Sequence, residues 1–177
     1  MIFEDYRKHT NSIKHLYETA FPACERKPFT IIERNSKKGK AEILAICKDG
    51  FAGLIISIFY KDIVLIDYFA VDEKKRGYGI GSQALSLIKE RYKGKRIFLE
   101  IERPDEKSEN NCQRISRRKF YLRNNLKSSG IYVNLYKTEM ELLIFSEPIN
   151  YEEYVQLYEH AMGKLWVHIL LRPKKIN

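Results

Sequence analysis

The chain has few cysteines and no long apolar run, and each shortage excludes a class of protein. Its three cysteines, Cys24, Cys47 and Cys112, are too widely spaced for a disulfide framework or a cysteine-rich zinc site. No stretch approaches the roughly 18 apolar residues of a membrane span. The N-terminal MIFEDYRKH lacks the apolar core of a secretion signal. We therefore expect a cytoplasmic protein without a membrane partner.

Acidic residues are outnumbered by basic ones, 23 against 32, so the formal net charge at pH 7 is +9. Basic residues cluster within residues 74–76, 91–96 and 114–119. Such an excess can indicate nucleic-acid binding, but no recognised binding motif or aromatic stacking pattern accompanies it. A nucleic-acid-binding module is an alternative, and we expect no nucleic-acid partner.

Histidines are also scarce. His9, His15, His160 and His168 are scattered at helix-like positions, and none has a cysteine or an acid at metal-ligand spacing along the chain. The sequence has no G-x-S-x-G pattern of a serine hydrolase. We therefore expect no metal cofactor and no hydrolase.

The 177 residues, 44% of them apolar, suit one hydrophobic core, and we predict a single domain over residues 1–177. Apolar periodicity predicts a mixed α/β fold, of the α+β kind, in which tight turns such as Asp49-Gly50 join antiparallel strands. The predicted helices cover residues 11–21, 28–39 and 79–92, and the predicted strands cover residues 41–47, 51–60, 63–71 and 96–102. The last strand should run parallel to the one before it, through a right-handed crossover.

The rest of the chain continues the mixture of helices and strands. The predicted elements are a basic helix ending at Asn124-Asn125, strands over residues 131–136 and 140–146, and a helix from Asn150 to about Leu171, stopped by Pro173. Asn150 and Glu153 match a capping box. Gly163 lies on the polar face of this last helix and could end it instead.

The most informative segment joins the strand at residues 63–71 to the following helix. It contains Gly77, Gly79 and Gly81, whose missing Cβ atoms let backbone N–H groups approach an anion closely. The N-terminus of the new helix favours negative charge. The pattern predicts a phosphate-binding turn.

Two other interpretations fit the glycines. Gly79-x-Gly81-x-x-Ala84 satisfies the dinucleotide fingerprint, and Glu100 follows at about the expected 20 residues. In that fold, however, the glycines follow the strand at once, whereas residues 72–78 intervene here. A purely structural turn is the other alternative.

Arg76, Gly79 and Gly81 form an R-x-x-G-x-G motif, which resembles the coenzyme A pyrophosphate loop of the GNAT superfamily of N-acetyltransferases. The resemblance implies the GNAT-type acyl-coenzyme A N-acyltransferase fold, whose central, mostly antiparallel twisted sheet has about six to seven strands flanked by helices. It also implies acetyl-coenzyme A as cosubstrate. The coenzyme contacts it implies are Phe69, Ala70 and Val71 for the pantetheine arm, and Arg76, Gly77, Tyr78, Gly79, Gly81 and Ser82 for the phosphates.

Tyr121 is the catalytic acid that the resemblance implies. Residues 120–126 resemble the segment in which family members place a tyrosine that donates to the coenzyme sulfur. A phenol with an ordinary pKa of about 10 is protonated at neutral pH and can donate. Asn125-Leu126 replaces the usual glycine-phenylalanine, and Arg114 stands where many members have an asparagine. These departures put the coenzyme contacts of this helix in question.

Four carboxylates are candidates for the base. Glu100 resembles the glutamate that members acting on peptide amines carry on this strand, and Glu102 shares its face of the strand by alternation. Asp67, alone in an apolar strand, needs a partner or a raised pKa. Glu25 lies where the family's first helices wall the acceptor site. We favour Glu100.

These features predict an N-acetyltransferase that moves an acetyl group from acetyl-coenzyme A to a primary amine by direct transfer in a ternary complex. Because the cysteines lie outside the motifs, no acetyl-cysteine step is expected. The acceptor is a small-molecule or peptide amine, and a homodimer is left open. The alternative is a coenzyme-binding regulatory or protein-interaction module without turnover.

Overall fold

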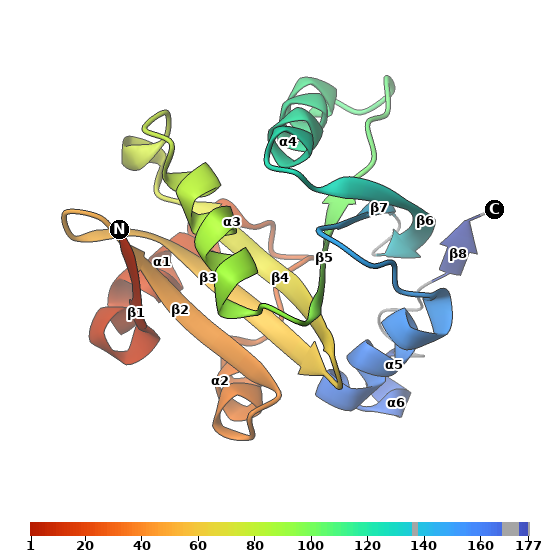
Figure 1. Ribbon diagram of the computed structural model, residues 1–177, viewed down its shortest axis with the longest axis horizontal. Coiled ribbons are helices and arrows are strands. Elements are labelled where there is room, and N and C mark those ends of the chain that lie inside the picture. The colour runs from red at the N-terminus through yellow and green to blue at the C-terminus, as the bar shows by residue number, and fades with distance from the viewer. Residues whose placement is uncertain (136–137, 168–173, 177) are drawn as a thin grey trace. The chain divides into compact units, whose positions relative to one another are not determined.

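The computed structural model describes residues 1–135, 138–167 and 174–176 (Figure 1). The chain divides into two compact units, which we call the first and the second unit. The first consists of Met1–Phe59 and Ile66–Lys93, and the second of Tyr60–Leu65 and Gly94–Asn177. A single domain over the whole chain stays a prediction.

The strands of the first unit are an antiparallel hairpin, an edge strand added to it, and most of the strand that follows the hairpin. They are β1 (Ile2–Asp5), β2 (Ala41–Cys47), β3 (Phe51–Tyr60) and the greater part of β4 (Ile63–Val71). β2, β3 and β4 have the predicted bounds. The β2–β3 turn has Asp49 at φ 52° and Gly50 at φ 91°, the positive values that a tight hairpin turn requires. The Asp-Gly pair in the sequence therefore predicted this turn correctly.

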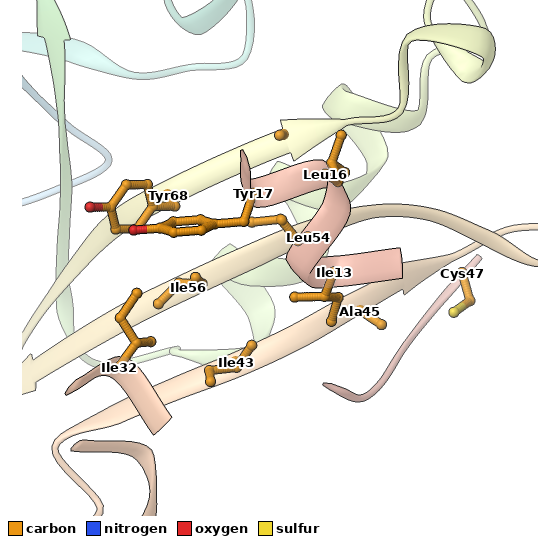
Figure 2. Packing of buried hydrophobic residues seen from close by; sticks show 11 residues of the cluster. Ile13, Leu16, Tyr17, Ile32, Ile43, Ala45, Cys47, Leu54, Ile56 and Tyr68 are labelled. Carbon is orange, nitrogen blue, oxygen red and sulfur yellow. The ribbon is translucent and has the colours of Figure 1, made fainter. Parts of the chain in front are cut away.

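Helices α1 (Thr10–Ala20) and α2 (Phe29–Lys37) cover one face of these strands, whereas α3 (Ile80–Arg91) lies on the other face (Figures 1 and 2). The α1 side chains Ile13, Leu16 and Tyr17 are buried against the sheet, as their spacing predicted. The ring of Tyr17 meets that of Tyr68 edge to face, with 4.8 Å between centroids. The core of the first unit thus anchors β4, the strand that leads to the glycine turn.

Gly53 of β3 shows how closely β3 and β4 approach. A Cβ atom added to Gly53 would lie 2.4 Å from the backbone oxygen of Ala70 and 3.2 Å from Cα of Val71. No side chain fits in that space, because real Cβ contacts of this length do not occur. No local pattern in the sequence predicts this contact.

The second unit contains four further strands and the remaining long helices. Its elements are β5 (Arg96–Glu102), α4 (Asn111–Arg123), β6 (Lys127–Leu135), β7 (Thr138–Ile144), α5 (Tyr151–Met162), the short α6 (Lys164–Trp166) and β8 (Lys174–Ile176). β7 pairs antiparallel with β5 and with β6, and β6 pairs antiparallel with β8. Of the predicted strand at residues 131–136, Tyr136 lies outside the described residues.

The last predicted helix is wrong in length. The capping box is present, since the Asn150 side chain accepts from the Glu153 N–H at 2.8 Å and Glu153 accepts from the Asn150 N–H at 3.0 Å. α5 nevertheless ends at Met162, because Gly163 adopts φ 90° and ψ 143°, outside the helical region. The alternative stop at Gly163 is correct. Leu171 and Pro173 lie outside the described residues.

Hydrogen bonds join the strands in the order β1-β2-β3-β4-β5-β7-β6-β8, in a mixed α+β fold with a mostly antiparallel sheet. This confirms the predicted fold class. The sheet has more strands than expected because β1 and β8 were missed. They have 4 and 3 residues, too few to show an alternating pattern. Among the described residues, every helix is too short or too polar to span a membrane.

Candidate active site

The glycine turn begins where β4 ends. Asp72 caps the short 3-10 helix η2 (Glu73–Lys75) and accepts a hydrogen bond from the Lys74 N–H at 3.0 Å. Arg76 turns back, and its Nε donates to the carbonyl oxygen of Val71 at 3.2 Å. The turn is therefore held by its own contacts. Gly77 and Gly79 are exposed, and Tyr78 between them is 72% exposed.

Helix α3 begins directly after Gly79, which has φ 72° in the left-handed region. No side chain caps this helix, and its first turn carries no acidic residue. The first N–H groups of a helix have no acceptor within it, so those of Gly81 and Ser82 are available to an anion. A Cβ added at Gly77 would meet no atom within 4 Å, and one at Gly79 only the Gln83 side chain at 3.9 Å. The space beside the turn is therefore open.

The basic residues near the turn are only partly available to phosphates. Lys75 Nζ donates to the carbonyl oxygens of Lys48 at 3.0 Å and Asp49 at 2.9 Å, which ties it to the β2–β3 turn. Arg91 pairs with Glu42 at 2.6 Å. Lys74 and Arg76 remain exposed. Lys75 and Arg91 are thus held by contacts inside the first unit and are less available to a phosphate group.

The predicted pantetheine strand, Phe69, Ala70 and Val71, forms the end of β4. Ala70 is 8% exposed, and the other two side chains are half-buried. The carbonyl oxygen of Val71 accepts from Arg76, and the next N–H, that of Asp72, donates to Ala52 at 2.9 Å. The strand end is therefore rigidly placed next to the turn. Its contact with pantetheine stays a prediction.

Asp67 has the partner that its apolar setting demanded. Lys27 Nζ lies 2.5 Å from Oδ1 and 2.7 Å from Oδ2 of Asp67, and both side chains are 4% exposed. A buried charge is stable only when it is paired in this way. The pairing favours a structural role for Asp67 over that of a base. Lys27 itself was missed, since nothing in the local sequence marks it as buried.

Glu25 lies in the connection between α1 and α2, which is bound to β4. The Tyr68 hydroxyl donates to the carbonyl oxygen of Glu25 at 2.8 Å and accepts from the Lys27 N–H at 3.1 Å. The Tyr17 hydroxyl donates to the carbonyl oxygen of Lys27 at 2.9 Å. The Glu25 side chain is partly exposed. The first unit thus brings Glu25 and Asp67 together through Tyr68 and Lys27.

In the second unit, Glu100 is held by the C-terminal helix α5. The Tyr158 hydroxyl donates to Oε2 of Glu100 at 2.8 Å. Tyr154, one turn earlier, is fully buried, and this burial together with the charge of Glu100 raises the pKa of its phenol well above the ordinary value. Tyr158 was not predicted as a site residue, because its spacing indicates only that it lies on the buried face of α5.

Glu102 has a different environment although it shares the face of β5 with Glu100. Arg114 and Arg117 of α4 each lie 2.9 Å from its carboxylate, which is 12% exposed. Arg118, on the same helix, pairs with the buried Glu141 at 2.7 Å. The basic cluster of α4 is therefore largely neutralised within the second unit, and Glu102 is a poorly placed base.

Tyr121 lies on α4 and is 8% exposed. Burial raises the pKa of its phenol to about 12, so the hydroxyl is protonated at neutral pH. Within the described part of the chain, this hydroxyl has no hydrogen-bond partner. α4 ends as predicted, with Asn125 in the left-handed region at φ 64°. Tyr121 therefore offers an unused proton donor.

Metal-ligand spacing along the chain predicted no metal-binding group, but folding brings Glu4, His9 and Cys47 together. Their ligand atoms lie within 4.8 Å of one another. The three residues are distant from the glycine turn in sequence, and they belong to the first unit.

Comparisons with known proteins agree with this arrangement. The family model described as "Acetyltransferase (GNAT) family" matches residues 10–116. A solved protein from Bacteroides thetaiotaomicron, assigned to the GNAT acetyltransferases, is 22% identical, with a TM-score of 0.75 over 93% of this chain and 99% of its own. An aminoglycoside 6'-N-acetyltransferase complexed with coenzyme A is 14% identical, with a TM-score of 0.62 over 85% of this chain and 100% of its own.

The ribosomal-protein-S18-alanine N-acetyltransferase from Escherichia coli is 13% identical, with a TM-score of 0.62 over 85% of this chain and 96% of its own. At these identities the solved structures are evidence of a shared fold. No curated protein sequence matches the chain.

Proposed function

Because this chain belongs to the acetyltransferase (GNAT) family, it is an acyltransferase that uses acetyl-coenzyme A, and we propose that its acceptor is a primary amine. The acetyl group passes directly from the thioester to the amine nitrogen in a ternary complex. The observation that carries the proposal is the glycine turn, which combines an uncapped helix N-terminus without acids, open space at the glycines and the exposed Arg76.

The transfer requires one proton acceptor and one proton donor. The amine must lose the proton of its ammonium form before its nitrogen attacks the thioester carbonyl, and we assign that proton to Glu100. The C–N bond forms as the C–S bond breaks, and the departing thiolate takes a proton, which we assign to the Tyr121 hydroxyl. The nitrogen loses its second proton as the amide forms, and this proton passes through water and restores the Tyr121 phenol. An unused, protonated phenol supports the second assignment. A carboxylate paired with a neutral hydroxyl supports the first.

The acceptor belongs to the class of small-molecule or peptide amines. Two proteins of the same fold act on members of this class, one on an aminoglycoside and one on an alanine of ribosomal protein S18. The free state of Cys24, Cys47 and Cys112 is consistent with a reducing cytoplasm.

A panel of amines tests the proposal. The purified protein is incubated with acetyl-coenzyme A and, in turn, aminoglycosides, polyamines and peptides with free N-termini, and release of coenzyme A is followed with a thiol reagent. Turnover of at least one primary amine, with the acetyl group found on nitrogen by mass spectrometry, is the expected result. Tight coenzyme binding without turnover of any amine would favour the non-catalytic module.

A further inference from the structure

Three potential metal ligands converge at the edge of the first unit, outside the glycine turn. β1 pairs antiparallel with β2 so that Ile2 faces Cys47 and Glu4 faces Ala45. Glu4 is therefore the diagonal neighbour of Cys47 on the same face of the sheet, within reach of a long side chain. His9 is the last residue of the 3-10 helix η1 (Tyr6–His9), which follows β1. Figure 2 shows Cys47 near one end of β2.

The distances between the ligand atoms suit a tetrahedral ion. His9 Nε2 lies 3.4 Å from Cys47 Sγ and 3.3 Å from Glu4 Oε2. In a tetrahedral zinc site, with bonds of roughly 2.0–2.3 Å, neighbouring ligand atoms are about 3.3–3.6 Å apart. The two measured distances already fall near this range, so an ion could enter with little movement of the side chains.

Burial and charge also suit a cation. Cys47 is 6% exposed, whereas the side chains of Glu4 and His9 are 26% and 21% exposed, so the group is closed on one side and open to solvent on the other. A thiolate and a carboxylate would balance the two positive charges of a divalent ion. The ring of Phe51 packs against that of His9 at 5.8 Å between centroids and limits its rotation.

One cation already competes for the carboxylate. Lys8 Nζ lies 3.7 Å from Glu4 Oε2, but the Lys8 side chain is 70% exposed and can turn into water. Lys75 also acts on Cys47 electrostatically, although its ammonium is bound to the β2–β3 turn. Among the described residues, neither lysine donates a hydrogen bond to His9 or Cys47. Neither therefore occupies the space between the three ligand atoms.

We propose that Glu4, His9 and Cys47 bind one zinc-type divalent ion, with a water molecule as the fourth ligand. Thiolate and imidazole ligands favour zinc over the oxygen-seeking magnesium and calcium. The ion would connect β1 and η1 to the end of β2, and would stabilise the N-terminal edge of the sheet. It takes no part in the proposed acetyl transfer.

Metal titration of the untagged, chelator-treated protein tests the site. Zn²⁺ is added in competition with a chromophoric chelator, and Co²⁺ is added separately as a spectroscopic probe. We expect one equivalent of either ion to bind and the cobalt form to show a thiolate-to-metal charge-transfer band. Cys47→Ser should remove this band and weaken Zn²⁺ binding by about 100-fold or more, since even outer-shell changes cost up to about 100-fold. Cys24→Ser, at an exposed cysteine, is the matched control and should bind as the wild type.

Thermal unfolding supplies a second readout. Saturating Zn²⁺ should raise the Tm of the wild type and of Cys24→Ser, but not that of Cys47→Ser, because only a ligand that binds the folded state stabilises it. His9→Gln, at a partly exposed position, replaces Cys47→Ser if the latter does not fold. The absence of stoichiometric binding, a cobalt spectrum without a thiolate band, or Zn²⁺ binding retained in both variants would overturn the proposal.

Discussion

At the residue scale, the candidate bases differ in what already neutralises their charge. Asp67 is paired with a buried ammonium and Glu102 with two guanidinium groups. Protonation of either carboxylate would leave cations without their partners, which is costly when the pair is buried. Glu100 accepts from the neutral Tyr158 hydroxyl instead. Proton transfer to Glu100 leaves this contact with a neutral group in place of a charged one, which is why we favour it.

Glu100→Gln tests that choice through pH. If Glu100 takes the ammonium proton, the variant should have a lower kcat/KM at neutral pH and should recover at alkaline pH, where free amine is plentiful. The measurement is kcat/KM against pH for any accepted amine. A raised KM at every pH with an unmoved pH limb would show that Glu100 only positions the acceptor.

Glu102→Gln is the matched control for Glu100→Gln, because it makes the same change two residues away on the same strand. Its effect on the neutral-pH rate should be much smaller. An equal loss in both variants would indicate a shared structural defect of β5, and a larger loss in Glu102→Gln would move the base to Glu102.

Tyr121→Phe tests the proton donor. The ring keeps its packing and only the hydroxyl is lost, so we expect kcat to fall by roughly 10²–10⁴-fold, the range for an acid–base group, with little change in coenzyme affinity. Steady-state kinetics with a calorimetric measurement of coenzyme binding separate the two effects. Because the pKa of Tyr121 is raised to about 12, deprotonation of this donor should cause no loss of wild-type activity below about pH 10. Unchanged kcat in the variant would reduce Tyr121 to a packing residue.

At the element scale, the connection between β4 and α3 is the proposed coenzyme loop. β4 is anchored by the core of the first unit, and α3 is anchored by the buried Ala84, Leu85 and Ile88. The turn between them presents N–H groups without covering side chains. β4 and α3 hold the two ends of the turn in place, whereas the N–H groups that could bind a phosphate belong to the connection between them.

Gly79→Asp should abolish coenzyme binding, because it adds a carboxylate and a Cβ where phosphates must approach. Gly39→Asp is a closely matched control, since Gly39 has φ 69° against 72° at Gly79 and also has open space around its Cβ position. Both variants should lose stability by about 1–2 kcal/mol through the left-handed backbone. Calorimetric titration with acetyl-coenzyme A should show binding only in Gly39→Asp. Unchanged affinity in Gly79→Asp would contradict the loop assignment, and tight binding of a nicotinamide dinucleotide to the wild type would support the dinucleotide alternative.

At the scale of the whole molecule, many acidic side chains are held in ion pairs with basic ones, although the formal net charge stays +9. Hydrogen bonds from Arg96 and the Asn150 N–H lower the pKa of Glu153. Burial opposes ionisation of Glu42 and Glu141, but their arginine partners outweigh it and lower both pKa values. These carboxylates therefore stabilise the folded state when ionised.

Acid should destabilise the protein through these groups. A carboxyl group whose pKa is lower in the folded than in the unfolded state contributes stability that is complete above the unfolded pKa and is lost as the pH falls through the folded pKa. With an ordinary pKa of about 4.3 for glutamate, the free energy of unfolding should be constant from pH 7 to about 5.5 and should fall towards pH 3. Urea denaturation at a series of pH values measures it. A free energy of unfolding that stays level down to pH 3 would contradict the expectation.

The same unfolding curves test the predicted single domain. One cooperative transition, with coincident curves from circular dichroism and from tyrosine fluorescence, is the expected result. Two separate transitions would indicate that the first and second units unfold independently.

The sequence by itself determined the features that depend on neighbouring residues. The bounds of β2, β3, β4 and β5, the Asp49-Gly50 turn, the capping box and the left-handed Asn125 follow from local apolar patterns and from backbone preferences. The glycine turn belongs to this group, since a strand, three glycines and a helix are adjacent in the chain. Gly163 shows the limit of such local signals, because a glycine on the polar face of a predicted helix can either lie within the helix or end it.

Only the tertiary structure decided which distant residues meet. Lys27 and Asp67 are separated by 40 residues and Tyr158 and Glu100 by 58, so no local pattern could pair them. The group of Glu4, His9 and Cys47 exists because β1, too short to be predicted, pairs with the end of β2. The physical reason is that a partner's identity depends on strand register and packing, which are set by the whole core and not by the residues next to it in the chain.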